Sequence, residues 1–170
     1  MAEEVLPTPA RVRPPLGIVH TSDSVALAAL RIGLGLVMFP HGAQKLLGWF
    51  GGAGFSDTMN AFTSMGIPAP AEFLLIVGEF SASLMLLTGF LTRLGALIVS
   101  VIMIGAIFMV HLPYGFFMNW SGMQGGEGFE FHLLAIAMAI ALMLGGGGVG
   151  SVDRLIEISA TRGNPDMPRR

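Results

Sequence analysis

Four long apolar stretches dominate the pattern of hydrophobic and polar positions along this chain. They cover residues 24–47, 70–90, 94–112 and 130–144. A helix of about 20 apolar residues spans the ~30 Å hydrocarbon core of a bilayer. The first three stretches reach that length, and the fourth does so only if the glycines at 145–148 lie in the membrane interface. The pattern predicts an all-α membrane protein, an antiparallel bundle of four transmembrane helices.

Local signals mark the ends of these helices. Asp23 or Ser24 can cap the first helix, because a short polar side chain accepts hydrogen bonds from first-turn N–H groups. Pro70 suits the first turn of the second helix, and Pro113 ends the third. No small-residue cleavage site follows the first apolar run, so it is predicted to be an uncleaved membrane helix and not a signal peptide.

Composition agrees with a membrane location. Hydrophobic residues make up 53% of the chain and charged residues only 12%, whereas a soluble domain has about a quarter of its residues charged. The net charge of −2 favours no nucleic-acid partner. Because the chain has no cysteine, it performs no thiol chemistry of its own.

Positive charges gather at one end of the predicted bundle. Arginines precede the first helix, occupy the turn between the second and third, and follow the fourth, whereas the opposite end carries Lys45 alone. Since positive residues favour the cytoplasmic side, both termini are predicted to be cytoplasmic. The loops 48–69 and 113–129 then face outward, with Trp49 and Trp120 as interfacial aromatic residues.

Ionisable residues within the helices fall at a common depth. Inserting one costs at least ~2.5–3.5 kcal/mol, so each one needs a partner or a function. A rise of about 1.5 Å per residue places members of all four helices in the outer half of the bundle. We call this set the outer polar layer and predict that it binds a cofactor; it contains His41, Glu79, His111, Glu130 and His132.

Arg31 lies deeper on the first helix, and Glu79 is its expected charge partner. Their estimated depths differ by about 8 Å, which a long arginine side chain can bridge. Two interpretations stay open: a salt bridge that merely lets two charges lie in lipid, or a pair that tunes a proton or anion site. His41 and Lys45 share one face of the first helix.

The histidines also raise the question of a metal or haem. Either would need several ligands meeting at one point, and for haem His41 with His111 is the pair to test. Each histidine alone is better explained by an interfacial hydrogen bond. Neither haem nor a metal is expected.

Several motifs resemble those of the DoxX family of small four-helix membrane proteins. The first helix contains LRIG, FPHG and QKL, the second helix and its turn contain GEF, LTGF and TR, and the last outer loop contains GFFMNW and GGEGFE. A closing turn reads GGGG with SVD shortly after it. The resemblance covers about residues 24–156. It leaves an irregular cytoplasmic N-terminal arm at 1–23 and a cytoplasmic tail at 157–170.

The resemblance implies a quinone-linked redox setting. Family members resemble the membrane subunit of a thiosulfate:quinone oxidoreductase, and others are linked to oxidative-stress complexes. The family's motif positions correspond here to Arg31, His41, Lys45, Glu79 and Glu130. The chain has no recognisable flavin, haem or iron–sulfur motif, so electrons would have to come from a partner.

Two functional hypotheses follow. The first is a quinone-handling subunit of a sulfur or oxidative-stress oxidoreductase, with Glu79, His41 and Lys45 as catalytic residues; the candidate cofactor-binding residues are Arg31, His41, Glu79, His111, Glu130 and His132. The alternative is a non-catalytic anchor, assembly factor or accessory subunit of a larger membrane complex. A transporter or channel would require an oligomer. The expected location is the bacterial inner membrane, crossed several times, with lipid and a protein complex as partners.

The predicted orientation can be tested with a reporter protein fused after Arg170. A reporter that fluoresces only in the cytoplasm should be active in that fusion, because the basic end of the bundle stays inside. Activity of a periplasm-specific reporter at the same position would overturn the orientation.

Overall fold

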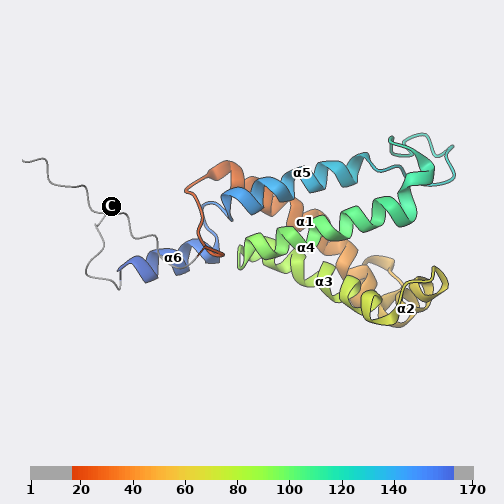
Figure 1. The fold of residues 1–170 in the computed structure, drawn as a ribbon, viewed down its shortest axis with the longest axis horizontal. Helices are drawn as coiled ribbons and strands as arrows, with labels where there is room; N and C mark the ends of the chain where they lie inside the picture. Colours follow the sequence, from red (N-terminus) through yellow and green to blue (C-terminus); the bar gives the residue numbers. More distant parts are fainter. Residues whose placement is uncertain (1–16, 163–170) are drawn as a thin grey trace, which may run out of the picture.

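The computed structural model describes residues 17–162, and every regular element in that range is helical (Figure 1). The helices, with short 3₁₀ or π segments labelled η, are α1 (Val25–Leu47), η1 (Trp49–Gly51), α2 (Gly54–Ser64), α3 (Ala69–Thr88), α4 (Thr92–Ala106), η2 (Ile107–His111), η3 (Leu112–Tyr114), α5 (Glu130–Gly145) and α6 (Val152–Arg162). The predicted all-α class is confirmed. Each predicted stretch agrees with a helix to within a few residues, except that the third passes from α into π and 3₁₀ geometry before it ends.

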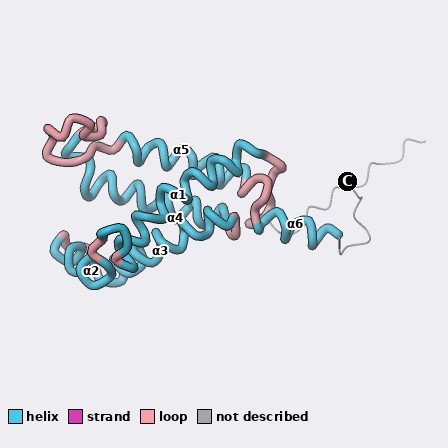
Figure 2. The backbone as a smooth tube through the Cα atoms, turned by 180° about the vertical axis from the view of Figure 1, so that it is seen from behind, coloured by secondary structure: helices cyan, strands magenta, loops and turns pink. Residues whose placement is uncertain are grey.

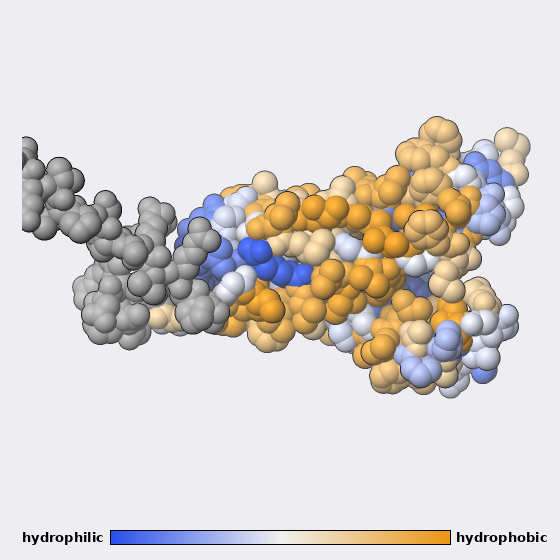
Figure 3. Space-filling model, viewed as in Figure 1, coloured by the Kyte–Doolittle hydropathy of each residue, from blue (hydrophilic) through white to orange (hydrophobic). Residues whose placement is uncertain are grey.

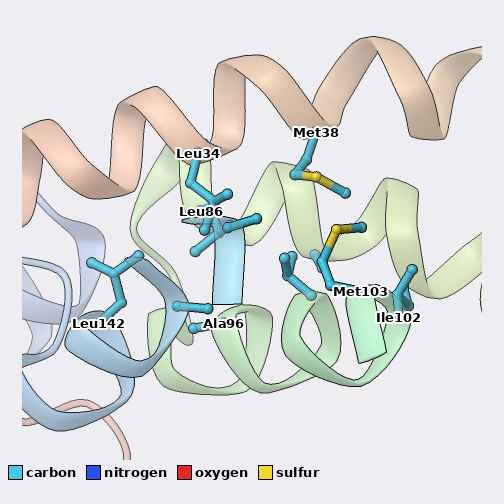
Figure 4. Packing of buried hydrophobic residues seen from close by; sticks show 11 residues of the cluster. Leu34, Met38, Leu86, Ala96, Ile102, Met103 and Leu142 are labelled. Atoms are coloured by element: carbon cyan, nitrogen blue, oxygen red, sulfur yellow. The ribbon is translucent and has the colours of Figure 1, made fainter. Parts of the chain in front are cut away.

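The long helices pack side by side and run in alternating directions (Figure 1). Helix α1 packs against α3 and α5, and α4 packs against the same two helices from the other side. The loops gather at the two ends of this assembly (Figure 2). Buried apolar side chains fill its centre, where Leu34 and Met38 of α1 lie opposite Leu86 of α3 and Met103 of α4 (Figure 4).

In the described part of the chain, three helical runs are long and apolar enough to cross a membrane. They are Val25–Leu47, Ala69–Thr88 and Thr92–Tyr114. Helix α5 has 16 residues and is shorter, as its apolar stretch predicted. Exposed apolar side chains cover the flanks of the bundle (Figure 3), including Leu74 and Leu134. Such a surface is suited to lipid.

Helix α1 begins where the sequence predicted. Ser24 caps it by accepting a hydrogen bond from the backbone N–H of Leu27 at 3.3 Å. Further along, Gly42 allows α1 to approach α3 closely. A Cβ atom at Gly42 would lie 2.7 Å from the Cα of Phe80, which is too close for any side chain. This backbone contact sets the spacing between the end of α1 and the middle of α3.

The sequence did not predict two of the helices, α2 and α6. Helix α2 occupies part of the predicted outer loop 48–69, and α6 begins inside the predicted membrane domain and extends into the predicted tail. Both have 11 residues. Helices this short and amphipathic give no span signal, because the length of an apolar run is what identifies a membrane helix.

We call the end of the bundle that holds α6 the inner end and the opposite end the outer end, after the sides that the sequence predicts for them. The inner end is closed by a network around Asp153. Its carboxylate accepts hydrogen bonds from the backbone N–H groups of Leu91 and Thr92, at 2.8 and 2.9 Å. These groups belong to the start of α4, so Asp153 caps a helix from another element. The Asp153 N–H donates to the carbonyl of Gly89, whose φ of +69° places it in the left-handed region that favours glycine. Helix α6 is thereby tied to the α3–α4 turn.

The segment before α1 also packs at this end. The Glu157 carboxylate of α6 accepts hydrogen bonds from the His20 ring at 2.6 Å and from the Thr21 N–H at 3.3 Å. Burial opposes the ionisation of Glu157, but these bonds and one from Arg154 outweigh it and hold the pKa of Glu157 below its ordinary value. The segment before α1 and helix α6 lie at the same end of the bundle (Figure 1). The rest of the predicted N-terminal arm and C-terminal tail lies outside the described residues.

Candidate functional site

Arg31 lies near the inner end, and its predicted pairing with Glu79 is wrong. Its Nε donates to the carbonyl of Gly147 at 2.9 Å, and its Nη1 donates to the carbonyls of Leu86 and Leu87 at 2.7 and 2.8 Å. Leu86 and Leu87 belong to the last turn of α3, where carbonyls have no partner within the helix. A cation is also favoured at this negative end of the helix dipole. Arg31 is therefore satisfied by backbone and needs no carboxylate.

Glu79 pairs with Lys45 instead. The Lys45 ammonium donates to both carboxylate oxygens of Glu79 at 2.7 Å. The Glu79 side chain is only 4% exposed and that of Lys45 is 33% exposed, so the pair is buried at one side and open at the other. Burying an ion is costly unless its charge and hydrogen bonds are matched, and this geometry matches both. The ion pair lies between the last turn of α1 and the middle of α3.

The close contact at Gly42 explains why these two side chains meet. Gly42 lies three residues before Lys45, and the backbone it touches belongs to Glu79 and Phe80. The rings of Phe39 and Phe80 also meet between these two helices, 5.7 Å apart.

A pair of histidines forms the second polar group at the outer end. The rings of His111 and His132 lie 4.1 Å apart, between η2 and α5. The His111 Nδ1 lies 2.8 Å from the carbonyl oxygen of Glu127. A carbonyl only accepts, so this Nδ1 carries the proton, and the other ring nitrogen accepts when the ring is neutral. His111 ends a π-helical segment, a feature frequent at functional sites.

His132 carries an unsatisfied polar atom. The residue is 8% exposed, and its buried Nδ1 has no hydrogen-bond partner within the described structure. A buried polar atom without a partner is costly and calls for an explanation, such as a bound molecule. His41 on α1 is exposed and lies within electrostatic reach of His132.

No arrangement of metal ligands is seen among residues 17–162. No three histidine, aspartate or glutamate side chains there are placed to hold a metal ion. The ring in contact with His111 is that of His132.

Glu130 holds the loop between η3 and α5 in place. One of its carboxylate oxygens accepts from the backbone N–H of Met118 at 2.9 Å and from the indole N–H of Trp120 at 3.2 Å. These bonds tie the loop to the start of α5. Trp120 itself is 86% exposed, as expected for a residue of the membrane interface.

Glu72 is a buried carboxylate that the sequence interpretation missed. It is fully buried between α2 and α3, where one oxygen accepts from the Thr63 hydroxyl at 2.8 Å and the other has no partner within the described structure. A glutamate in an otherwise apolar first turn was the available signal. It was overlooked because the helix start is near the interface, where charges are ordinary, and α2 was not predicted.

The fold and its polar residues define a small helical membrane protein. The sequence model of the DoxX family, described as DoxX, matches residues 26–112, slightly more than half of the chain. The chain belongs to the DoxX family, and the resemblance found in its motifs is confirmed.

Two relatives extend the comparison. A Bacillus subtilis (strain 168) protein named "Putative oxidoreductase CatD" is 26% identical over 124 residues, which cover 73% of this chain and 83% of that protein. A Mycobacterium tuberculosis (strain ATCC 25618 / H37Rv) protein named "Uncharacterized membrane protein Rv3486" is 28% identical over 155 residues, 85% of this chain and 89% of that protein. No solved structure matches the chain.

The ion pair yields a prediction about stability. Replacing Lys45→Met leaves the Glu79 carboxylate buried without its cation and should lower the free energy of unfolding by about 3 kcal/mol. The double variant Lys45→Met/Glu79→Leu removes both charges and should recover most of that loss. Reversible unfolding in lipid bicelles measures both values. Equal stability of the single variant and the wild type would show that the pair is not formed.

Proposed function

We propose that this protein is a quinone-linked subunit of a membrane oxidoreductase in the bacterial inner membrane. It crosses the membrane four times, with α5 as the fourth span and both termini in the cytoplasm. The quinone ring binds at the outer ends of α1, α3 and α5. Membership of the DoxX family supports this proposal, as does a relative whose name includes the word oxidoreductase.

The observation that carries the proposal is the ion pair of Lys45 and Glu79. It is buried on one side and partly open on the other. A structural charge in lipid is best fully enclosed, as that of Arg31 is. A pair with an open side can exchange partners with a bound molecule.

The chemistry of quinone reduction fits these groups. A quinone takes up two electrons and two protons to become a quinol, and its two carbonyl oxygens become hydroxyls. The carbonyls need hydrogen-bond donors, which the Lys45 ammonium and the histidine N–H groups can supply. The hydroxyls of the product need acceptors, which Glu79 can supply. A proton acceptor and donor within reach of one ring are what general acid–base catalysis requires.

Electrons reach the ring from a partner protein in this proposal. The chain has no cysteine. The partner's redox centre supplies both electrons, while this chain binds the ring and moves protons. The complex that includes the partner is the functional unit.

A second candidate is a non-catalytic accessory subunit. The observation in its favour is the exposure of Phe117, Trp120 and Met123 on the outer loop. These side chains form a surface that a partner protein can cover. In that case the buried charges only hold the helices together.

Two substitutions separate these functions. Glu79→Gln removes the charge and the proton acceptor but keeps the shape of the side chain, and Glu72→Gln is its matched control on the same helix. In membranes that contain the complete complex, Glu79→Gln should lower the rate of quinone reduction at least about 100-fold, the usual size of a general-base contribution. Glu72→Gln should leave the rate near that of the wild type.

His41→Ala should also lower the rate, whereas His20→Ala at the inner end should not. The amount of each variant in the membrane is measured by immunoblotting. If Glu79→Gln and His41→Ala insert normally and keep full activity, the accessory function is the correct one.

A further inference from the structure

Arg93 joins three elements at the inner end of the bundle. It is the second residue of the candidate span Thr92–Tyr114 and is partly buried. Its guanidinium donates to the carbonyls of Met143 and Leu144 in the last turn of α5, at 2.6 and 3.2 Å. It also donates to the carbonyl of His20, at 3.0 Å from Nη2 and 3.3 Å from Nε. The segment before α1, the start of α4 and the end of α5 thus meet at one cation.

The positive charge of Arg93 has no carboxylate beside it. Arg154, at the same end, forms ion pairs with Asp23 and Glu157, but within residues 17–162 no ion pair involves Arg93. Its bonds to carbonyls use four of the five N–H groups of an arginine and leave one on Nη1.

Arg93 is also more accessible than Arg31, the other arginine that binds helix-end carbonyls. Arg31 is only 2% exposed, whereas the hydrogen bonds from the Nη2 of Arg93 lie at the surface. An accessible guanidinium without an acidic partner favours an anionic ligand, and its planar fork suits the oxygens of a phosphate.

A groove with apolar walls begins at this arginine. Its volume is about 260 Å³, and its lining consists of Ile18 from the segment before α1, Arg93, Leu94 and Leu97 from α4, and Met143 from α5. Ile18, Leu94 and Leu97 are exposed, so the groove lies on the outer flank of the bundle. Because Arg93 is part of the lining, one site combines an unpaired cation with an apolar channel.

The position of Arg93 indicates which anion binds. Arg93 lies in the first turn of a membrane-spanning helix, at the level where the hydrocarbon core gives way to the lipid headgroups. Basic pockets between membrane helices bind the headgroups of anionic lipids. Beyond the groove, exposed apolar side chains continue along α4 at helical spacing, among them Val101. An acyl chain can follow such a surface, whereas a small soluble anion gains nothing from apolar walls.

We infer that Arg93 binds the phosphate of an anionic phospholipid and that the groove beside it holds the first part of an acyl chain of the same molecule. The lipid then contacts the segment before α1, α4 and α5 together. The site lies between α4 and α5, whereas the ion pair of Lys45 and Glu79 lies between α1 and α3. The inference therefore goes beyond the proposed function and does not depend on it.

Native mass spectrometry of the purified full-length protein can test this site. It measures the affinity for added phosphatidylglycerol, which is anionic, and for phosphatidylethanolamine with the same acyl chains, which is zwitterionic. The wild type should bind phosphatidylglycerol about fivefold more tightly, which corresponds to about 1 kcal/mol, the contribution of one arginine near a membrane surface.

Substitutions at Arg93 should change this preference. Arg93→Gln should abolish it, and Arg93→Lys should keep part of it, because an ammonium retains the charge but not the planar fork. Arg154→Gln is the matched control, since it removes one positive charge from the same end and leaves Arg93 in place. It should keep the preference of the wild type.

A second pair of variants leaves the hydrogen bonds of Arg93 intact. Leu97→Trp fills the groove and should weaken the binding of phosphatidylglycerol about fivefold, the effect of losing roughly 40 Å² of apolar contact. Leu74→Trp, on the exposed face of α3, is its control and should bind like the wild type. This pair decides the question even if Arg93→Gln, which also loses its bonds to α5, fails to fold.

Four results would overturn the inference. If Arg93→Gln and Arg154→Gln lower the preference equally, total charge and not this site selects the lipid. If Leu97→Trp binds phosphatidylglycerol like Leu74→Trp, the groove holds no acyl chain. If glycerol phosphate, which lacks acyl chains, binds as tightly as the lipid, the apolar walls contribute nothing. If the wild type is a dimer that Leu97→Trp separates, a second copy of the chain covers the groove.

Discussion

A charge inside a bilayer must find its partner within the protein, because no water is there to solvate it. This constraint explains the placement of three buried ionisable side chains. Arg31 takes two carbonyls from the end of α3 and one from the loop after α5. Asp153 takes two N–H groups from the start of α4, and Glu79 takes the Lys45 ammonium. Each of these contacts joins elements that are distant in the sequence, so the matching of charge also fixes how the helices meet.

The two ends of the bundle meet this constraint in different ways. At the inner end, Arg31 and Asp153 are enclosed and bonded to backbone, which no ligand can displace without opening the fold. At the outer end, Lys45 keeps an open side and His132 keeps a nitrogen without a partner. The two ends of the bundle also differ in shape. At the outer end, α2 and the loop after η3 diverge and leave an open notch between them (Figure 3). The inner end thus has its charges enclosed, and the outer end is the end that the proposed function assigns to ligand binding.

The sequence predicted the three long apolar helices well because apolar length is a direct consequence of bilayer thickness. It did not predict the partners of the polar residues, because partner choice depends on helix rotation and helix spacing, which the rise per residue does not give. Arg31 is the clearest case: two of its acceptors, the carbonyls of Leu86 and Leu87, are available because α3 ends at Gly89, a left-handed position. Similarly, the pair of Lys45 and Glu79 depends on the close backbone contact at Gly42, which is not evident before the helices are assembled. Glu72 and α2 were missed together, because the burial of Glu72 depends on α2, and α2 was not predicted.

The central claim is that the open ion pair at the outer end takes part in binding a quinone. The most direct measurement is the quinone content of the protein purified from its native membrane in mild detergent, compared with the Lys45→Met/Glu79→Leu variant, in which the charges are removed but the packing is retained. The account predicts close to one quinone per wild-type chain and almost none in the variant. Equal quinone content in the two proteins, or none in either, would contradict it.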